Sequence, residues 1–308
     1  MSIKLGIHIG PQDVSMEDMK RLWTMADEAK MYWASLMDHF YANPLRSKTD
    51  PCFEAVSSMA ALAATTSHVR VGTLMFCSLY RNPGLLAKAA ITMDHISNGR
   101  VELGIGAGWF KEEFEDYGYE FPEVKERMDQ FEEALIITKT LLREGEVKFD
   151  GKYYKVDAVS RPMPVNRELR IWVGGRGPKR TPRIAAQYAD GFNTPYCEPD
   201  EFADRMGVLD AACEKFGRDP KAIMRTINVH FLIGADEAGI KRGQDFYDNL
   251  GDQHRRGAML GGKQQAIDRI GEYIKAGADG LNIAFRPPVD WDAYQMYLEE
   301  IVPVFHGK

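Results

Sequence analysis

The sequence predicts a (β/α)8 barrel, the TIM-barrel fold, and three observations carry this prediction. Short runs rich in Val, Ile and Leu alternate with longer helical patterns along nearly the whole chain, which is typical of parallel strands joined by helices. The alternation occurs eight times, whereas an open doubly wound sheet more often has about five to seven strands. The 308 residues suit one barrel, although two domains of roughly 150 residues would also fit. We therefore expect a single domain over residues 1–308, with insertions near its carboxyl-terminal mouth.

The expected strands are β-rich runs bounded by turn residues, at residues 4–9, 33–37, 69–76, 101–105, 169–174, 191–194, 227–233 and 280–284. The expected helices lie between them, at residues 16–30, 52–65, 83–96, 126–142, 178–188, 199–216, 263–276 and 291–304. Boundary residues support these ranges, because Pro83 and Pro178 suit a first helical turn, and Asn98-Gly99 and Gly277 suit a helix end.

Two stretches do not fit an ideal barrel. Residues 147–157, with Gly151 at a turn, predict a β-hairpin, and residues 235–262 are rich in Gly and charge with weak periodicity. We expect both stretches to be insertions beside the mouth of the barrel. Long loops there often serve as lids or binding loops, but plain surface decoration is an equal alternative for the second stretch.

Composition excludes several classes of protein. With 44% hydrophobic and 27% charged residues, the chain can bury a sizeable core, so disorder, collagen and coiled coil are excluded. The 39 basic residues against 45 acidic ones give a net charge of −6, so nucleic acid is not an expected partner. No apolar run approaches the roughly 20 residues of a membrane span, and no secretion signal is visible. We expect a cytoplasmic protein with no membrane partner.

The four cysteines form no C-x-x-C pair and lie far apart, at Cys52, Cys77, Cys197 and Cys213. Neither a zinc site nor a disulfide framework is indicated, and a reducing cytoplasm fits best. No H-E-x-x-H or similar ligand cluster occurs, so we expect no catalytic metal. We interpret Cys77 as a packing residue rather than a nucleophile, because no His accompanies it locally.

An active site on this fold lies at the carboxyl ends of the strands. The second expected strand ends in Asp38 and His39, which places a carboxylate and an imidazole at the mouth. Histidine is the side chain that transfers protons near neutral pH. A capping Asp and a His satisfied by nearby backbone are an equally good interpretation of these two residues.

Two glycine-rich turns follow the fourth and fifth strands. Residues 104–109 carry glycines at alternate positions, which suits either a flat cofactor or tight packing, and they match a dinucleotide fingerprint poorly. Residues 174–177 lead into a helix start, where backbone N–H groups attract anions. Four basic residues occur there, which favours phosphate binding over a solvated basic helix face: Arg176, Lys179, Arg180 and Arg183.

Over nearly its whole length, the chain resembles the bacterial luciferase-like flavin and deazaflavin oxidoreductase family. The segments that carry the resemblance are residues 38–40, 72–74, 80–83, 94–100, 104–110, 172–177 and 189–193. The run Gly106-Ala107-Gly108-Trp109-Phe110, followed by Glu112-Glu113-Phe114, is most similar to the branch that depends on coenzyme F420. In the sugar-phosphate dehydrogenases of this family a Glu occupies the place of Trp109, so sugar-phosphate oxidation is not expected.

The resemblance implies a cofactor at the mouth and a non-prolyl cis peptide in the third strand's bulge, at Cys77-Ser78. It implies that Asp38 contacts the deazaflavin head and that His39 donates or accepts a proton. The remaining residues that it assigns to the ring, ribityl chain and phosphate are Cys77, Ser78, Gly106, Ala107, Gly108, Gly174, Gly175, Arg176, Gly177 and Arg180.

The expected activity is hydride transfer between coenzyme F420 and a small organic substrate, with His39 handling the proton. Aromatic residues near the mouth favour a largely apolar substrate. An FMN-dependent monooxygenase that uses reduced flavin and oxygen is the alternative, and the basic cluster at 176–183 favours the longer anionic tail of F420. A non-catalytic flavin-binding protein is a further alternative. The resemblance also implies a homodimer.

Overall fold

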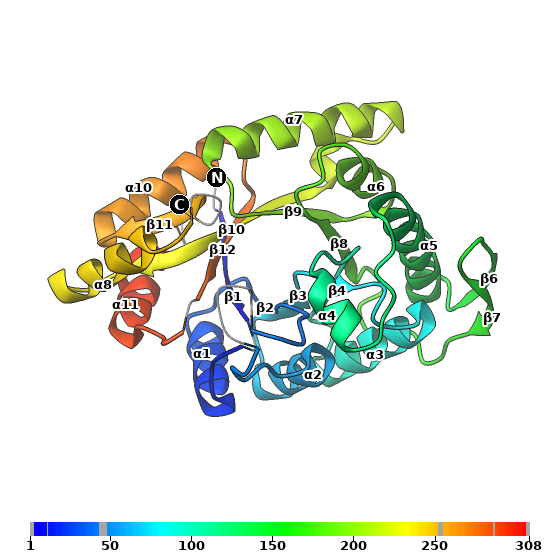
Figure 1. The fold of residues 1–308 in the computed structure, drawn as a ribbon, viewed down its shortest axis with the longest axis horizontal. Coiled ribbons are helices and arrows are strands. Elements are labelled where there is room, and N and C mark those ends of the chain that lie inside the picture. The colour runs from blue at the N-terminus through cyan, green and yellow to red at the C-terminus, as the bar shows by residue number, and fades with distance from the viewer. Residues whose placement is uncertain (1–2, 11, 43–47, 252–254, 286, 306–308) are drawn as a thin grey trace.

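The computed structural model describes residues 3–10, 12–42, 48–251, 255–285 and 287–305. Within these ranges, eight strand positions form one closed parallel barrel (Figure 1), which confirms the predicted fold class. In barrel order they are β1 (Lys4–Ile9), β2 (Trp33–Leu36), β3 (Arg70–Thr73), β5 (Val101–Gly106), β8 (Arg170–Gly174), β9 (Gly191–Pro195), β10 (Met224–Ile233) and β12 (Gly280–Ala284). The barrel closes where β12 pairs with β1.

Helices surround the strands and cover their outer faces (Figure 1). They are α1 (Met16–Glu28), α2 (Ala55–Thr65), α3 (Pro83–Ile96), α5 (Val124–Arg143), α6 (Arg180–Tyr188), α7 (Pro199–Lys215), α10 (Lys263–Lys275) and α11 (Trp291–Met296), which continues through Tyr297–Ile301 and Val302–Phe305. Each expected helix therefore has a counterpart whose ends differ by a few residues. Pro83 opens α3 as predicted, after an Asn82 side chain that accepts hydrogen bonds from two backbone N–H groups.

The third strand is interrupted, whereas the sequence predicts one continuous strand. β3 ends at Thr73, and β4 (Phe76–Cys77) pairs separately with β5. Between them the Leu74–Met75 peptide is cis, so the expected position at Cys77-Ser78 is wrong by three residues. The apolar run is unbroken in sequence, which is why composition alone does not reveal the interruption.

The predicted hairpin is confirmed, but its expected position beside the mouth is wrong. β6 (Glu146–Asp150) and β7 (Lys155–Val159) pair antiparallel, and they join the carboxyl end of α5 to β8. Because α5 runs back toward the amino ends of the strands, the hairpin leaves from the rim opposite the mouth. Its turn is bound to α5 through Glu133, which accepts backbone hydrogen bonds from residues 152–154. Figure 1 shows the hairpin outside α5.

Three further elements lie at the mouth or beside it. The short helix α4 (Lys111–Asp116) follows β5 and has no counterpart among the expected helices. Residues 235–262 hold α8 (Glu237–Asp248) and β11 (Ala258–Gly261), and β11 extends the sheet by pairing with the carboxyl half of β10. The 3-10 turn Pro220–Ala222 is not one of these three, because it precedes β10 and lies at the rim opposite the mouth. The second insertion is thus partly regular structure.

The main apolar core lies between the strands and the helices, while the inside of the barrel holds many polar side chains beside a smaller apolar cluster of Trp33, Leu74 and Trp172. On β10, Ile227 and Val229 belong to the main apolar cluster, whereas Thr226, Asn228 and His230 alternate with them and point inward. The same alternation places Asn282 of β12 inside the barrel. The inward-facing positions near the mouth therefore carry little of the apolar packing.

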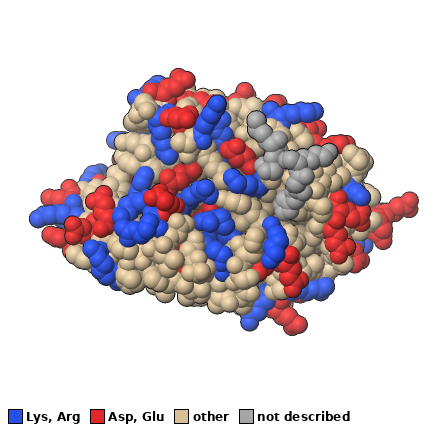
Figure 2. Space-filling model, turned by 180° about the vertical axis from the view of Figure 1, so that it is seen from behind, with Lys and Arg blue, Asp and Glu red and all other residues tan. Residues whose placement is uncertain are grey.

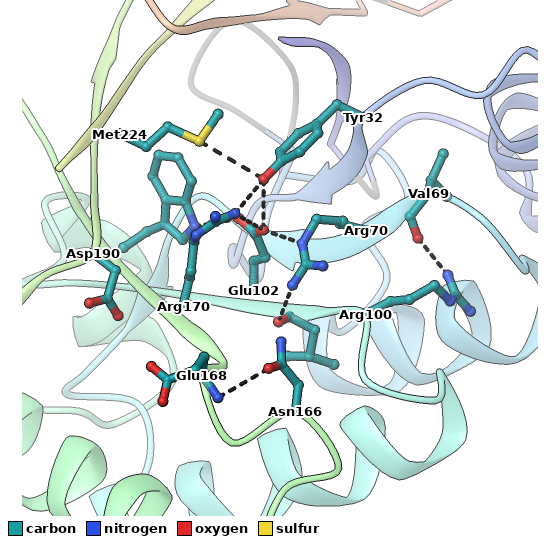
Figure 3. A network of polar contacts seen from close by, with 12 residues as sticks. Tyr32, Val69, Arg70, Arg100, Glu102, Asn166, Glu168, Arg170, Asp190 and Met224 are labelled. Atoms are coloured by element: carbon teal, nitrogen blue, oxygen red, sulfur yellow. Dashed lines mark hydrogen bonds and ion pairs between the residues drawn. The ribbon is translucent and has the colours of Figure 1, made fainter. Parts of the chain in front are cut away.

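Glu102 fills the barrel interior at the lower end, which is the end opposite the mouth. It is completely buried, and it accepts hydrogen bonds from the Tyr32 hydroxyl (3.1 Å), Trp172 Nε1 (2.7 Å) and Arg170 (3.2 Å), with Arg70 also paired to it (Figure 3). Burial, followed by the charge of Glu102, raises the pKa of Tyr32 to about 12. These residues lie at the amino ends of their strands, so the network forms the end opposite the mouth.

Acidic and basic side chains are interspersed over the face that Figure 2 shows, without a continuous field of one sign. Among the helices of the described ranges, none has both the length and the apolar character to cross a membrane.

Candidate functional site

A cavity of about 760 Å³ opens at the carboxyl ends of the strands. Its lining contains most of the predicted site residues: Asp38, His39, Cys77, Gly106, Ala107, Gly108, Gly174, Gly175, Arg176 and Gly177. Ser78 and Arg180 do not belong to the lining. The Ser78 side chain is buried, and its backbone N–H donates to the carbonyl of Gly106 at 2.9 Å.

One wall of the cavity is built from glycines whose missing side chains serve two purposes. At Gly104, a Cβ atom would overlap the Thr73 carbonyl, so this glycine serves tight packing. At Gly106, the nearest atom to such a Cβ is Met75 Cβ at 3.3 Å, so this position can hold a methyl group only by narrowing the cavity. At Gly174, a Cβ atom would overlap the Met75 Cε atom and would lie 2.8 Å from the Asn193 carbonyl oxygen. The missing side chains at Gly104 and Gly174 therefore make room for the Met75 side chain, and this wall is formed by glycine backbone together with Met75.

Asp38 lies in the lining, and its carboxylate is bound by the protein itself. It accepts hydrogen bonds from the Cys77 backbone N–H (2.8 Å) and from two guanidinium nitrogens of Arg81 (2.5 and 2.8 Å). Burial lowers the pKa of Arg81, but the hydrogen bonds to Asp38 outweigh it and raise that pKa above its ordinary value. Asp38 thus fixes the end of β4 at the edge of the cavity.

His39 is held by a carboxylate that lies far away in the sequence. Its Nδ1 atom is 2.7 Å from Oε2 of Glu113, which is completely buried at the start of α4. The other oxygen of Glu113 accepts the backbone N–H groups of Phe40 and Tyr41, each at 2.9 Å. Because Nδ1 is engaged, Nε2 is the ring nitrogen that can exchange a proton with a ligand.

Tyr80 completes the surroundings of Glu113, to which its hydroxyl donates at 3.1 Å. Burial, and then the nearby Cys77 and Glu113, raise the pKa of Tyr80 well above its ordinary value, so it keeps this proton. Glu113 lies in the run that resembles the F420 branch, but the sequence assigns this residue no role, because it does not show that Glu113 is buried beside His39.

Two of the four basic residues in the cluster of residues 176–183 form ion pairs with carboxylates on α5. Arg180 pairs with Asp129 at 2.5 Å, and Arg183 pairs with Glu132. Arg176 lines the cavity and donates to the carbonyls of Tyr196 (2.8 Å) and Pro195 (3.3 Å). An anion at this end of the cavity would therefore meet Arg176 and the start of α6, and not all four basic side chains.

The cysteine thiols are expected to react slowly in the folded protein. Burial raises the pKa of Cys52, Cys77 and Cys197 to about 12 each and raises that of Cys213. At pH 8, a pKa of about 12 leaves roughly one thiolate in 10,000. With Ellman's reagent, we expect little reaction before unfolding and four thiols after it. Fast labelling of a single thiol in the native protein would contradict this expectation.

Among the residues that the structure describes, no group of three or more His, Cys, Asp or Glu side chains could hold a metal ion.

The luciferase-like monooxygenase family profile matches residues 1–277. An F420-dependent glucose-6-phosphate dehydrogenase of Kribbella flavida is 30% identical over 334 aligned positions, which cover 99% of this chain and 98% of that protein. The corresponding enzyme of Nocardia farcinica is 29% identical and covers 76% of this chain and 70% of its own length.

Solved structures share the fold at low identity. An F420-dependent secondary alcohol dehydrogenase in complex with an F420–acetone adduct superposes with a TM-score of 0.87 and 19% identity, covering both chains completely. The long-chain alkane monooxygenase LadA superposes with a TM-score of 0.81 and 15% identity, covering 99% of this chain and 91% of its own. The barrel, the family match and these relatives agree with one another, and the chain is an oxidoreductase-type member of the luciferase-like monooxygenase family.

Proposed function

We propose that the protein transfers a hydride between coenzyme F420 and a small, largely apolar organic substrate, with His39 as the proton donor or acceptor. The observation that carries this proposal is His39, fixed by the buried Glu113 at the edge of a cavity with a glycine wall. Relatives with about 30% identity are F420-dependent dehydrogenases, which supports the choice of cofactor.

The residues of the cavity fit a planar cofactor. Gly106, Gly174 and the Met75 side chain form a wall on which a planar ring can stack. Gly175 to Gly177 lead to the start of α6, where backbone N–H groups and Arg176 suit a phosphate. When bound, the deazaflavin supplies the two-electron hydride chemistry. The protein's part is to position the substrate beside His39 Nε2, to exclude water with lining aromatic side chains such as Trp109 and Phe110, and to move one proton.

A sugar phosphate is a poor fit for the substrate, although the dehydrogenases named above are called glucose-6-phosphate dehydrogenases. The family resemblance places Trp109 where the sugar-phosphate dehydrogenases carry a Glu, and the Trp109 ring lies edge-on to His39 with centroids 5.7 Å apart. Within the described lining, Arg176 is the one Lys or Arg side chain, and it is bound to two backbone carbonyls.

The test is a titration of the purified protein with coenzyme F420 and, separately, with FMN, followed by tryptophan fluorescence and absorbance. Trp109 borders the cavity, so its emission should change on binding. We expect tighter binding of F420 and oxidation of reduced F420 by a panel of ketones, enones and imines. Tighter binding of FMN with oxygen-dependent turnover would support the monooxygenase instead. Binding of neither would overturn the proposal.

Gly106→Ala is expected to weaken F420 binding by about tenfold, which equals about 1.4 kcal/mol. Its new methyl group would lie on the cavity wall, 3.3 Å from Met75 Cβ, where the ring must approach the backbone. Gly271→Ala is the matched control, because a Cβ there meets nothing within 4 Å. The measurement is the dissociation constant by fluorescence. Equal F420 dissociation constants for Gly106→Ala and Gly271→Ala would mean that the cofactor ring does not lie against Gly106.

A further inference from the structure

The glycine wall and a polar wall face each other across the barrel. In the barrel order β1-β2-β3-β5-β8-β9-β10-β12, the strand opposite β3 is β10 and the strand opposite β8 is β1. The Leu74–Met75 bulge and Gly174 therefore lie across the cavity from His230 and His8, which also line it. A planar cofactor on the glycine wall leaves the polar wall for the substrate.

Two histidines belong to this polar wall and line the cavity. His8 and His230 are both in register with Ala284, the small residue on the strand between them. The Nδ1 atom of His8 is 2.9 Å from Ser35 Oγ, and the ring of His230 stacks on Tyr196 with centroids 4.1 Å apart. Both imidazoles are thus held by neighbours on their own sides of the cavity.

Asn228 lies two residues before His230 on the same strand and forms the floor. Its Oδ1 accepts hydrogen bonds from the amides of Asn193 and Asn282, each at 3.1 Å. These two donors fix the orientation of the amide, so its Nδ2 hydrogens point away from them. Within the described residues, this Nδ2 donates no hydrogen bond to protein, although Asn228 is 98% buried and lines the cavity. This amide donor therefore faces the cavity, where it is available to an acceptor on a bound ligand.

We propose that Asn228 donates a hydrogen bond to a second oxygen of the substrate, remote from the carbon that exchanges the hydride. This inference rests on the proposed function, which places the reacting carbon beside His39. The substrate class is then a neutral, mainly apolar compound with two oxygen functions, one at His39 and one at the floor. An ether, hydroxyl or carbonyl oxygen satisfies the amide without bringing a charge into the barrel.

Three small ring compounds of nearly equal shape test the inference: cyclohexanol, tetrahydropyran-4-ol and 4-hydroxypiperidine. The last is an ammonium ion at pH 7. Their dissociation constants are measured by saturation-transfer NMR, with saturating F420 and again without cofactor. The wild-type protein should bind tetrahydropyran-4-ol about five- to tenfold more tightly than cyclohexanol and should bind the ammonium compound weakest.

Asn228→Asp is the decisive variant, because it keeps an oxygen that accepts from Asn193 and Asn282 and replaces the cavity-facing donor with an acceptor. The variant should lose the preference for tetrahydropyran-4-ol and bind 4-hydroxypiperidine about tenfold more tightly than the wild type. A gain in binding cannot come from unfolding. Asn228→Ala brings no buried charge. It should lose the preference for tetrahydropyran-4-ol over cyclohexanol but should not bind 4-hydroxypiperidine more tightly than the wild type.

The outcomes separate the two proposals. An unchanged order of the three compounds in Asn228→Asp, with native circular dichroism, would overturn the role of Asn228. Failure of F420 to bind or react would overturn the proposed function, while the preference measured without cofactor would still support or contradict the inference.

Discussion

The His39→Ala variant is expected to lower F420-linked turnover by about 100- to 10,000-fold, while the dissociation constant for F420 changes by less than about threefold. The imidazole is the proton-transfer group of the cavity lining that is held by a buried carboxylate, at 2.7 Å from Glu113. The wall proposed to hold the cofactor ring is separate from His39, so this substitution should lower turnover without weakening F420 binding. The measurement is steady-state kinetics beside a fluorescence titration.

Glu113→Gln serves as the companion variant. The amide oxygen of Gln can still accept the backbone N–H groups of Phe40 and Tyr41, but it brings no negative charge to His39. We expect a loss of about tenfold in turnover with F420 binding retained, since the ring stays in place without its charged partner. A His39→Ala variant with wild-type turnover would show that another group moves the proton.

Glu102→Ala is expected to lower the free energy of unfolding by about 3–5 kcal/mol. The substitution removes a fully buried carboxylate and leaves Arg70, Arg170 and the Trp172 N–H without their common acceptor. Glu102→Gln preserves the shape and should lose less, about 1–3 kcal/mol. Urea unfolding followed by circular dichroism measures both values.

Glu28→Ala is the control for that experiment, because Glu28 is exposed on α1 and should change stability by no more than about 0.5 kcal/mol. Since Glu102 lies at the end of the barrel opposite the cavity, folded Glu102→Gln should bind F420 as the wild type does. Equal stability of Glu102→Ala and the control would mean that the network at the lower end contributes nothing to folding.

The eight strand–helix units were predictable because each strand is a short apolar run and each helix has its own period and boundary residues. The position of His39 at a strand end was predictable for the same reason. Its partner Glu113 was not, because 74 residues separate the two and α4 is too short to show a helical period. The carboxylates that bind Arg180 and Arg183 lie 51 residues earlier on α5, so sequence alone made those cations look available.

The main apolar layer between strands and helices is separate from the inward-facing side chains of the barrel. This separation has a consequence for how the recognition properties of such a protein can change. Inward-facing positions such as 226, 228 and 230 alternate with the residues that hold strands to helices. Substitutions at the inward positions near the mouth therefore change what the cavity recognises while the apolar layer stays intact. Homologous chains can acquire new substrates, and engineered libraries can explore them, by varying alternate residues of the same strands.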